Sequence, residues 1–102
     1  MKKIINGKKY DTETAKCLAT AHSSLSPTDF GYWSEWLYLK KSGEYFLHGE
    51  GGPMSKYGVK CGRNSWGWGS RIIPYTEGEA MAWAEEHLDG DEFEQIFGEV
   101  EE

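Results

Sequence analysis

The chain has 102 residues, a net charge of −6 and an aromatic content of 15%. This length suits a single domain with its own core, and no stretch approaches the roughly 20 apolar residues that cross a membrane. The N-terminus MKKIINGKKY lacks the apolar segment of a signal peptide, so we expect a cytoplasmic protein without membrane contact. Cys17 and Cys61 have no paired spacing and are expected to be free thiols.

Charge is distributed unevenly along the chain. All eleven Lys and Arg residues lie between Lys2 and Arg71, a stretch that holds only six acids. Residues 72–102 hold eleven acids and no base, so the balance changes from near +5 to near −11. Such an asymmetry steers charged partners, although acidic helices also serve simply to keep a small protein in solution.

The first segments show the signals of a hairpin and a turn. Lys2–Tyr10 is predicted to form a β-hairpin around Asn6-Gly7, a dipeptide that tolerates the positive φ angles of a type I′ turn. Asp11 is expected to cap a short turn over Thr12–Lys16. Residues 17–21 fit either a continuation of that turn or a short strand, and the pattern leaves both open.

The middle of the chain is rich in aromatic side chains and leucine. After a polar loop over residues 22–31, residues 32–40 and 44–48 are predicted to pair as the central hairpin of an antiparallel sheet. A two-residue turn at Ser42-Gly43 would place Leu39 opposite Phe46. It would also place Leu37 opposite His48, leaving the other face to Trp36, Tyr38, Tyr45 and Leu47. Apolar groups on both faces indicate that this hairpin is the central one of the sheet.

The segment EYFLHGEGGPMSKYG, residues 44–58, raises the question of a nucleotide site. The strand is expected to end at His48, and a P-loop would then require Gly-x-x-x-x-Gly-Lys-Ser/Thr at the start of a helix. Here Lys56 follows Ser55, Pro53 interrupts the glycines, and Glu50 would repel a phosphate. We therefore expect the segment to set a specific backbone path and not to bind a nucleotide.

Two tryptophans stand in the next loop. Residues 57–61 and 71–73 are predicted to be short strands, and the loop over 62–70 places Trp66 and Trp68 between Arg63 and Arg71. Exposed aromatic side chains beside arginine stack on nucleobases or anchor a protein interface. Alternatively, one tryptophan folds back to close the sheet.

The last third of the chain has a helical period. Thr76 and Glu79 match a capping box, which predicts a helix over 77–88. Its apolar side carries Ala80, Met81, Trp83, Ala84 and Leu88. A second cap is predicted at Asp91, with a helix over 91–97 that ends at Gly98.

These elements predict one α+β domain over residues 1–102. A small antiparallel β-sheet with hairpins, basic and within residues 1–75, is followed by two acidic C-terminal helices within 76–102. The helices are expected to pack on the sheet.

Groups that could support catalysis or bind a metal lack any defining spacing. His48, Glu50 and Lys56, with His22 as a second imidazole, could serve metal-free RNA cleavage, but nothing fixes their geometry. Cys17, His22, His48 and Cys61 lack the close pairing of a zinc site. Buried thiols and a packed histidine explain them better, so we expect no enzyme activity, no metal and no cofactor.

Three stretches resemble small proteins of phages and conjugative elements of Gram-positive bacteria. They are MKKIINGKKYDTETA, LYLKKSGEYFLHGEGGPMSKY and IIPYTEGEAMAWAEEHLDGDEFEQIFGEVEE, and they cover most of the chain outside residues 17–31 and 59–70. Some proteins of this kind are anti-CRISPR proteins directed at the type II effector nuclease. The resemblance implies an inhibitor that is encoded by a mobile genetic element and acts in the host bacterial cell. It transfers no catalytic motif, so no residue inherits a role.

The resemblance and the charge asymmetry together favour a non-enzymatic, anti-CRISPR-like inhibitor of host defence. An RNA-guided nuclease holds its guide and target in a positively charged channel, for which an acidic surface can compete. The predicted partner-binding residues are Glu79, Glu85, Glu86, Asp89, Asp91, Glu92, Glu94, Trp66 and Trp68. One alternative is a nucleic-acid-binding accessory protein that binds RNA through the basic sheet, and a second is a metal-free RNA-cleaving enzyme.

Overall fold

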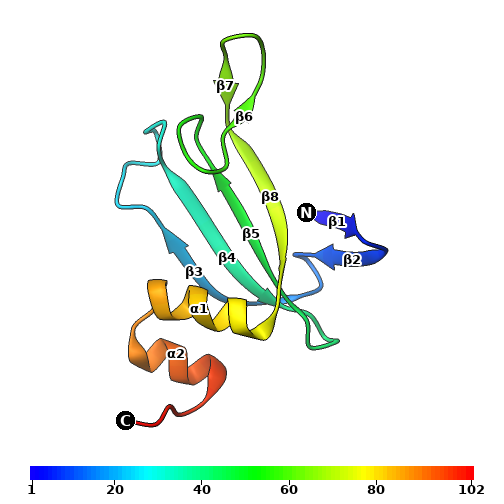
Figure 1. The fold of residues 1–102 in the computed structure, drawn as a ribbon, viewed down its shortest axis with the longest axis vertical. Coiled ribbons are helices and arrows are strands. Elements are labelled where there is room, and N and C mark those ends of the chain that lie inside the picture. The colour runs from blue at the N-terminus through cyan, green and yellow to red at the C-terminus, as the bar shows by residue number, and fades with distance from the viewer.

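A computed structural model describes all 102 residues and shows an α+β fold, as the sequence predicts. Its elements are β1 (Lys2–Ile5), β2 (Lys8–Asp11), β3 (Lys16–His22), β4 (Trp33–Leu39), β5 (Tyr45–Gly51), β6 (Val59–Lys60), β7 (Trp66–Gly67), β8 (Gly69–Tyr75), α1 (Glu77–His87) and α2 (Gly90–Phe97). An antiparallel sheet in the order β3-β4-β5-β8 forms the middle layer (Figure 1). The two helices cover one face of this sheet and the β1–β2 hairpin covers part of the other.

The N-terminal hairpin forms as predicted. Asn6 and Gly7 take φ angles of 52° and 79°, which are the left-handed values that a type I′ turn requires. Tyr10 at the end of β2 packs edge-on against Phe46 of the sheet, with ring centroids 5.6 Å apart. Of the two alternatives for residues 17–21, the structure shows the strand, β3.

The central hairpin is confirmed, but its predicted register is wrong by one residue. Lys40 and Glu44 close a three-residue loop in which Gly43 has a φ of 93°. Leu37 therefore lies opposite Leu47, and Trp36 lies opposite His48. Because side chains alternate between the faces of a strand, this register exchanges the face of every β5 side chain relative to β4.

The corrected register builds one core on each face of the sheet. On the helix face, Leu37 and Leu47 pack against Ala80, Trp83 and Phe93, all buried. On the opposite face, the buried cluster consists of Tyr10, Phe46 and Ile72. Both faces of the sheet thus carry buried apolar side chains, as expected, but the predicted distribution of the residues between the two faces is wrong.

Both helices begin at capping boxes, and only the first is placed correctly from the sequence. Thr76 and Glu79 cap α1 reciprocally, with N–H···O distances of 3.1 and 2.9 Å. The cap of α2 is Asp89, whose carboxylate accepts from the Glu92 N–H at 2.8 Å, so the prediction of a cap at Asp91 is wrong. Gly90 is therefore the first residue of α2 and does not belong to the linker between the two helices. Neither helix combines the length and the apolar character that a membrane span needs.

Residues 49–70 differ from the predicted loops. Strand β5 continues through Gly49 to Gly51 instead of ending at His48. Within the expected loop 62–70, Trp66 and Gly67 form β7, which pairs with β6. The β6–β7 hairpin, residues 59–67, projects from the end of the sheet that is opposite to the helices (Figure 1). We call this hairpin the finger.

Candidate binding surfaces

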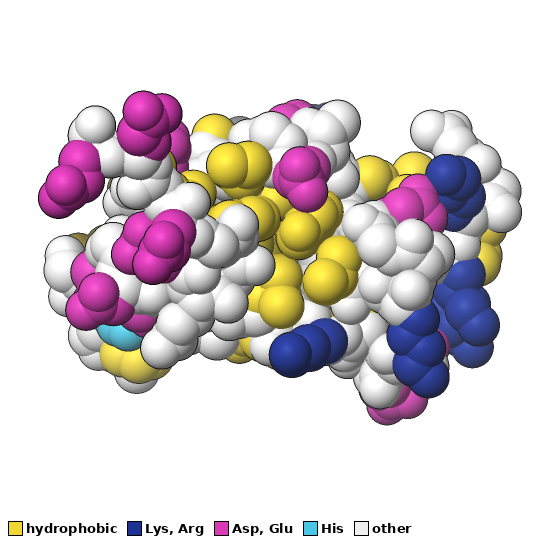
Figure 2. Space-filling model, turned by 90° about the horizontal axis from the view of Figure 1, so that it is seen from below, with side chains coloured by type: hydrophobic (Ala, Val, Ile, Leu, Met, Phe, Trp, Pro, Cys, Tyr) yellow, Lys and Arg dark blue, Asp and Glu magenta, His cyan; other side chains and the backbone are white.

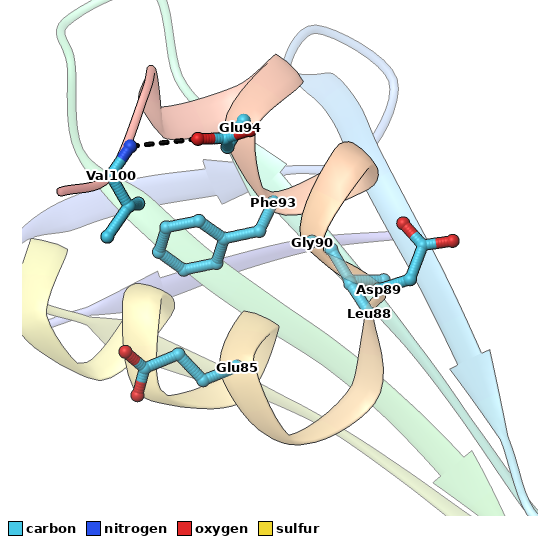
Figure 3. Close-up of a pocket in the computed structure, with 7 residues that line it drawn as sticks. All are labelled: Glu85, Leu88, Asp89, Gly90, Phe93, Glu94 and Val100. Carbon is cyan, nitrogen blue, oxygen red and sulfur yellow. Dashed lines mark hydrogen bonds between the residues drawn. The ribbon is translucent and has the colours of Figure 1, made fainter. Parts of the chain in front are cut away.

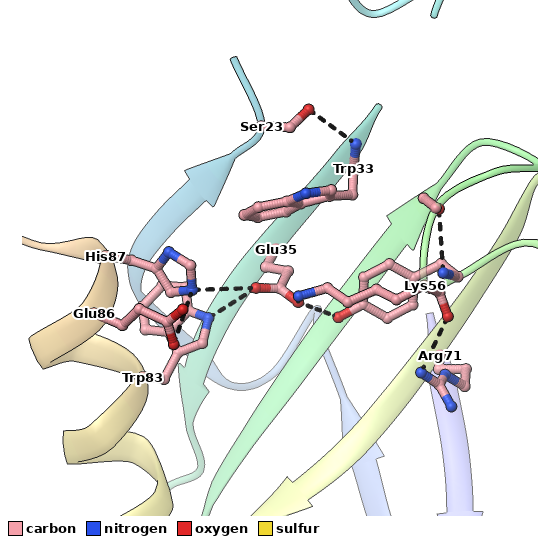
Figure 4. Close-up of polar contacts among 10 residues, drawn as sticks. Ser23, Trp33, Glu35, Lys56, Arg71, Trp83, Glu86 and His87 are labelled. Atoms are coloured by element: carbon pink, nitrogen blue, oxygen red, sulfur yellow. Dashed lines mark hydrogen bonds and ion pairs between the residues drawn. The ribbon is translucent and has the colours of Figure 1, made fainter. Parts of the chain in front are cut away.

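A buried carboxylate connects the helical layer, the sheet and the loop before the finger. Glu35 in β4 is only 2% exposed and faces the helices. Its carboxylate accepts hydrogen bonds from the Tyr57 hydroxyl and, at 2.9 Å, from Nε1 of Trp83. Nζ of Lys56 forms an ion pair with it at 2.8 Å. Figure 4 shows Glu35 held between α1 and the loop that carries Lys56, and no buried side-chain nitrogen or oxygen atom lacks a hydrogen-bond partner.

The glycine-rich segment delivers Lys56 and Tyr57 to that carboxylate. A Cβ atom at Gly49 would lie 2.0 Å from Cζ of Tyr57, so the ring crosses the sheet directly over Gly49. Around it, Gly52 and Gly58 have backbone carbonyl oxygens 2.3 Å from the positions of their missing Cβ atoms. These close approaches explain the glycines and agree with the expected structural role of the segment.

Charge in this network is balanced by direct pairing. Burial by itself raises the pKa of the Glu35 carboxyl, but hydrogen bonds from Lys56, Tyr57 and Trp83 outweigh it and hold this pKa below its ordinary value. Burial and the bond to Glu35 raise the pKa of the Tyr57 hydroxyl. Glu35 is therefore an anion and Tyr57 a neutral donor near neutral pH.

The groups considered for RNA cleavage lie on two different faces. His48 and Glu50 occupy the sheet face opposite to the helices, where His48 stacks on Trp36 with centroids 5.2 Å apart. Lys56 lies on the helix face and is paired with Glu35. His22 packs against Tyr32 at 6.4 Å. The structure thus does not bring His48 and Lys56 together.

The residues considered as metal ligands are likewise not assembled into one cluster. No three His, Cys, Asp or Glu side chains converge in a metal-binding arrangement. Cys17 at the start of β3 and Cys61 in the finger are free, as expected, but both are exposed, so the interpretation as buried thiols is wrong. His48 is half-buried and packed, and burial lowers the pKa of its imidazole.

Carboxylates gather at the helical end of the molecule. All seven predicted acidic residues, Glu79, Glu85, Glu86, Asp89, Asp91, Glu92 and Glu94, are exposed. Three of them, Glu79, Asp89 and Glu92, also cap the helices, which fixes their side chains. Figure 2 shows most of the acidic side chains at the left of this face, most of the lysine and arginine side chains at the right with a few acidic ones among them, and apolar groups between.

A shallow cleft of about 430 Å³ opens within this acidic surface. Its apolar floor consists of Leu88, Phe93 and Val100, and Glu85, Asp89 and Glu94 form its rim (Figure 3). The Glu94 carboxylate accepts the Val100 N–H at 2.9 Å and thereby holds the C-terminal tail against α2. The cleft thus joins an apolar floor to a ring of negative charge.

No known protein family matches this chain. Searches of curated proteins and of solved structures found no match either. The candidate surfaces must therefore be judged on their own geometry.

The two predicted tryptophans are both exposed, Trp66 by 58% and Trp68 by 50%, so neither closes the sheet. They point to different surroundings. Trp66 lines a shallow pocket with Pro53 and Met54, whereas Trp68 lies near Tyr32, with ring centroids 6.5 Å apart, and beside Glu50.

Sequence reasoning missed Glu35 and the exposed Met54. Glu35 could have been found, because it is the one acid within the apolar strand 32–40 and alternates with Leu37 on the same face. Its partners could not have been found from the sequence, because Tyr57 and Trp83 are 22 and 48 residues away along the chain.

Proposed function

We propose that this protein is a non-enzymatic inhibitor that binds an RNA-guided nuclease of a host defence system through its acidic helical end. The observation that carries the proposal is that no lysine or arginine of the protein itself neutralises the carboxylates at this end. None of the eleven carboxylate side chains after Ile72 lies within 4.0 Å of a lysine or arginine nitrogen. Such a surface is available to an external cation-rich partner.

The arrangement of the carboxylates supports competition with a nucleic acid. A guide or target strand lies in a positively charged channel of the nuclease. Capped helices hold Glu79, Asp89 and Glu92 in fixed positions, so these charges lose little conformational freedom when a partner binds. Rigid, unpaired carboxylates therefore suit a surface that replaces phosphates.

The apolar cleft can supply the binding affinity that exposed charges alone do not give. Interfaces take most of their affinity from a few desolvated contacts at the centre, while exposed rim charges mainly speed association. The floor of Leu88, Phe93 and Val100 can accept one apolar side chain of the partner, and the surrounding acids can pair with lysines or arginines beside it. The preferred partner segment is thus basic with an apolar anchor.

A cleavage assay tests this proposal. The purified type II effector nuclease, loaded with guide RNA, is titrated with the protein and target DNA is added. Inhibition that is complete near an equimolar ratio, with guide RNA intact afterwards, is the expected result for a binding inhibitor. Degraded guide RNA, or full cleavage at a large excess of the protein, would refute it. A helix-surface variant, Glu85→Lys with Glu86→Lys, is expected to inhibit less.

A further inference from the structure

The end of the molecule opposite the acidic helices exposes large apolar side chains. Met54 is 79% exposed, Phe30 63% and Trp66 58%. The backbone N–H of Met54 donates to the Phe30 carbonyl at 2.8 Å, which places these two loops side by side. Trp66 of the finger shares a shallow pocket of about 350 Å³ with Met54. Exposed apolar groups at this density mark a binding site more often than an inert surface.

The finger within this end is positively charged and free of acids, although Asp29, next to Phe30, and Glu50, beside Trp68, are exposed nearby. Between Gly51 and Arg71 the chain holds four basic residues and no Asp or Glu. Lys56 is paired with Glu35, and Arg71 lies over the Tyr57 ring with its Cζ 5.3 Å from the centroid. Lys60 and Arg63 are exposed and make no ion pair. The finger thus offers two unpaired cations.

The pairing within the finger brings charge and aromatic surface together. Lys60 in β6 lies directly opposite Trp66 in β7, so their side chains project from the same face. Every nucleobase has a flat apolar face that stacks on tryptophan, and the phosphate of the same nucleotide lies within reach of a neighbouring cation. In a duplex these base faces are already stacked, so the arrangement fits a single strand.

We propose that the finger and the Phe30–Met54 surface bind single-stranded nucleic acid, with one base on Trp66 and phosphates on Lys60 and Arg63. Charge complementarity favours this occupant over a protein, because the finger itself holds Lys60 and Arg63 and no acid that could pair with basic side chains of a partner. The proposal does not depend on the acidic helices. A failure of this proposal can therefore be distinguished from a failure of the proposed inhibitor function.

The test is fluorescence anisotropy with a fluorescein-labelled 12-nucleotide single-stranded RNA, its DNA equivalent and the RNA duplex. We expect both single strands to bind, the duplex to bind at least tenfold more weakly, and quenching of tryptophan emission. Two phosphate contacts predict a slope of about −1.4 in a plot of log K against log salt. Trp66→Ala is expected to weaken binding on the order of 5- to 150-fold, the range of base–aromatic stacking.

Trp68 provides the matched control. It is exposed to a similar extent but lies beside Glu50, which repels phosphate, so Trp68→Ala is expected to change affinity less than twofold. Trp66→Phe is expected to retain more affinity than Trp66→Ala, and Lys60→Glu with Arg63→Glu to abolish the salt dependence. Absence of binding by the wild type, equal binding of the duplex, or a larger loss in Trp68→Ala than in Trp66→Ala would overturn the proposal. Absence of binding would leave this end as a surface for a protein.

Discussion

Glu35 and Gly49 are cross-strand neighbours, and the missing side chain of Gly49 leaves the space through which Tyr57 reaches the Glu35 carboxylate. This relationship explains why a glycine stands inside strand β5. It also explains the path of the loop that follows, because Lys56 and Tyr57 must arrive together above the helix-facing side of the sheet.

Gly49→Ala is expected to destabilise the protein by about 3 kcal/mol, since the new Cβ would lie 2.0 Å from Cζ of a tyrosine that is anchored by Glu35. The free energy of unfolding from urea titration measures this effect. Gly90→Ala is the control, because nothing lies within 4 Å of its Cβ position, and it should change stability by less than about 1 kcal/mol. Equal effects of the two substitutions would contradict the proposed close contact.

Glu35→Gln should change how stability depends on pH. The pKa of Glu35 in the folded protein lies below its ordinary value of 4.5, so the folded state binds fewer protons than the unfolded state in acid. Its contribution is therefore complete above the unfolded pKa and is lost as pH falls through the folded pKa. The stability difference between wild type and Glu35→Gln is expected to be large at neutral pH and to shrink below about pH 4.5. A difference that is constant across this range would show that Glu35 does not titrate as described.

The start of α2 can be tested with two neighbouring acids. Asp89→Ala is expected to cost about 1 kcal/mol, because it removes the acceptor for the Glu92 N–H. Asp91→Ala should cost less than about 0.5 kcal/mol, since its carboxylate only interacts with the helix dipole. Thermal or urea unfolding of both variants decides which residue is the cap. A larger loss of stability in Asp91→Ala than in Asp89→Ala would support the cap predicted from the sequence.

Signals carried by residues close together in the sequence predict this fold well. The Asn6-Gly7 turn and the Thr76–Glu79 capping box each depend only on the stereochemistry of a few neighbouring residues, and both form where expected. The turn at Gly43 was harder, because a left-handed glycine serves two- and three-residue loops alike, and the choice moved the register by one.

Contacts between residues that are distant along the chain could not be predicted from sequence patterns. The Glu35 network requires residues 35, 57 and 83 to be in contact, and local periodicity carries no information about such contacts. The finger is a short hairpin whose pairing covers two residues in each strand, so its alternation is too brief to recognise.

Charge reversal tests the proposed binding function most directly. The variant Glu85→Lys, Glu86→Lys, Asp91→Lys changes exposed acids that do not cap a helix, and Lys2→Glu, Lys9→Glu, Lys41→Glu is the control with exposed, unpaired lysines. Binding of each to the immobilised type II effector nuclease is measured by surface plasmon resonance at several salt concentrations. We predict that the acidic variant associates at least about tenfold more slowly and loses its salt dependence, because exposed charges steer association within roughly 8–10 Å. Unchanged binding of the acidic variant, with binding lost in the lysine variant, would contradict the account.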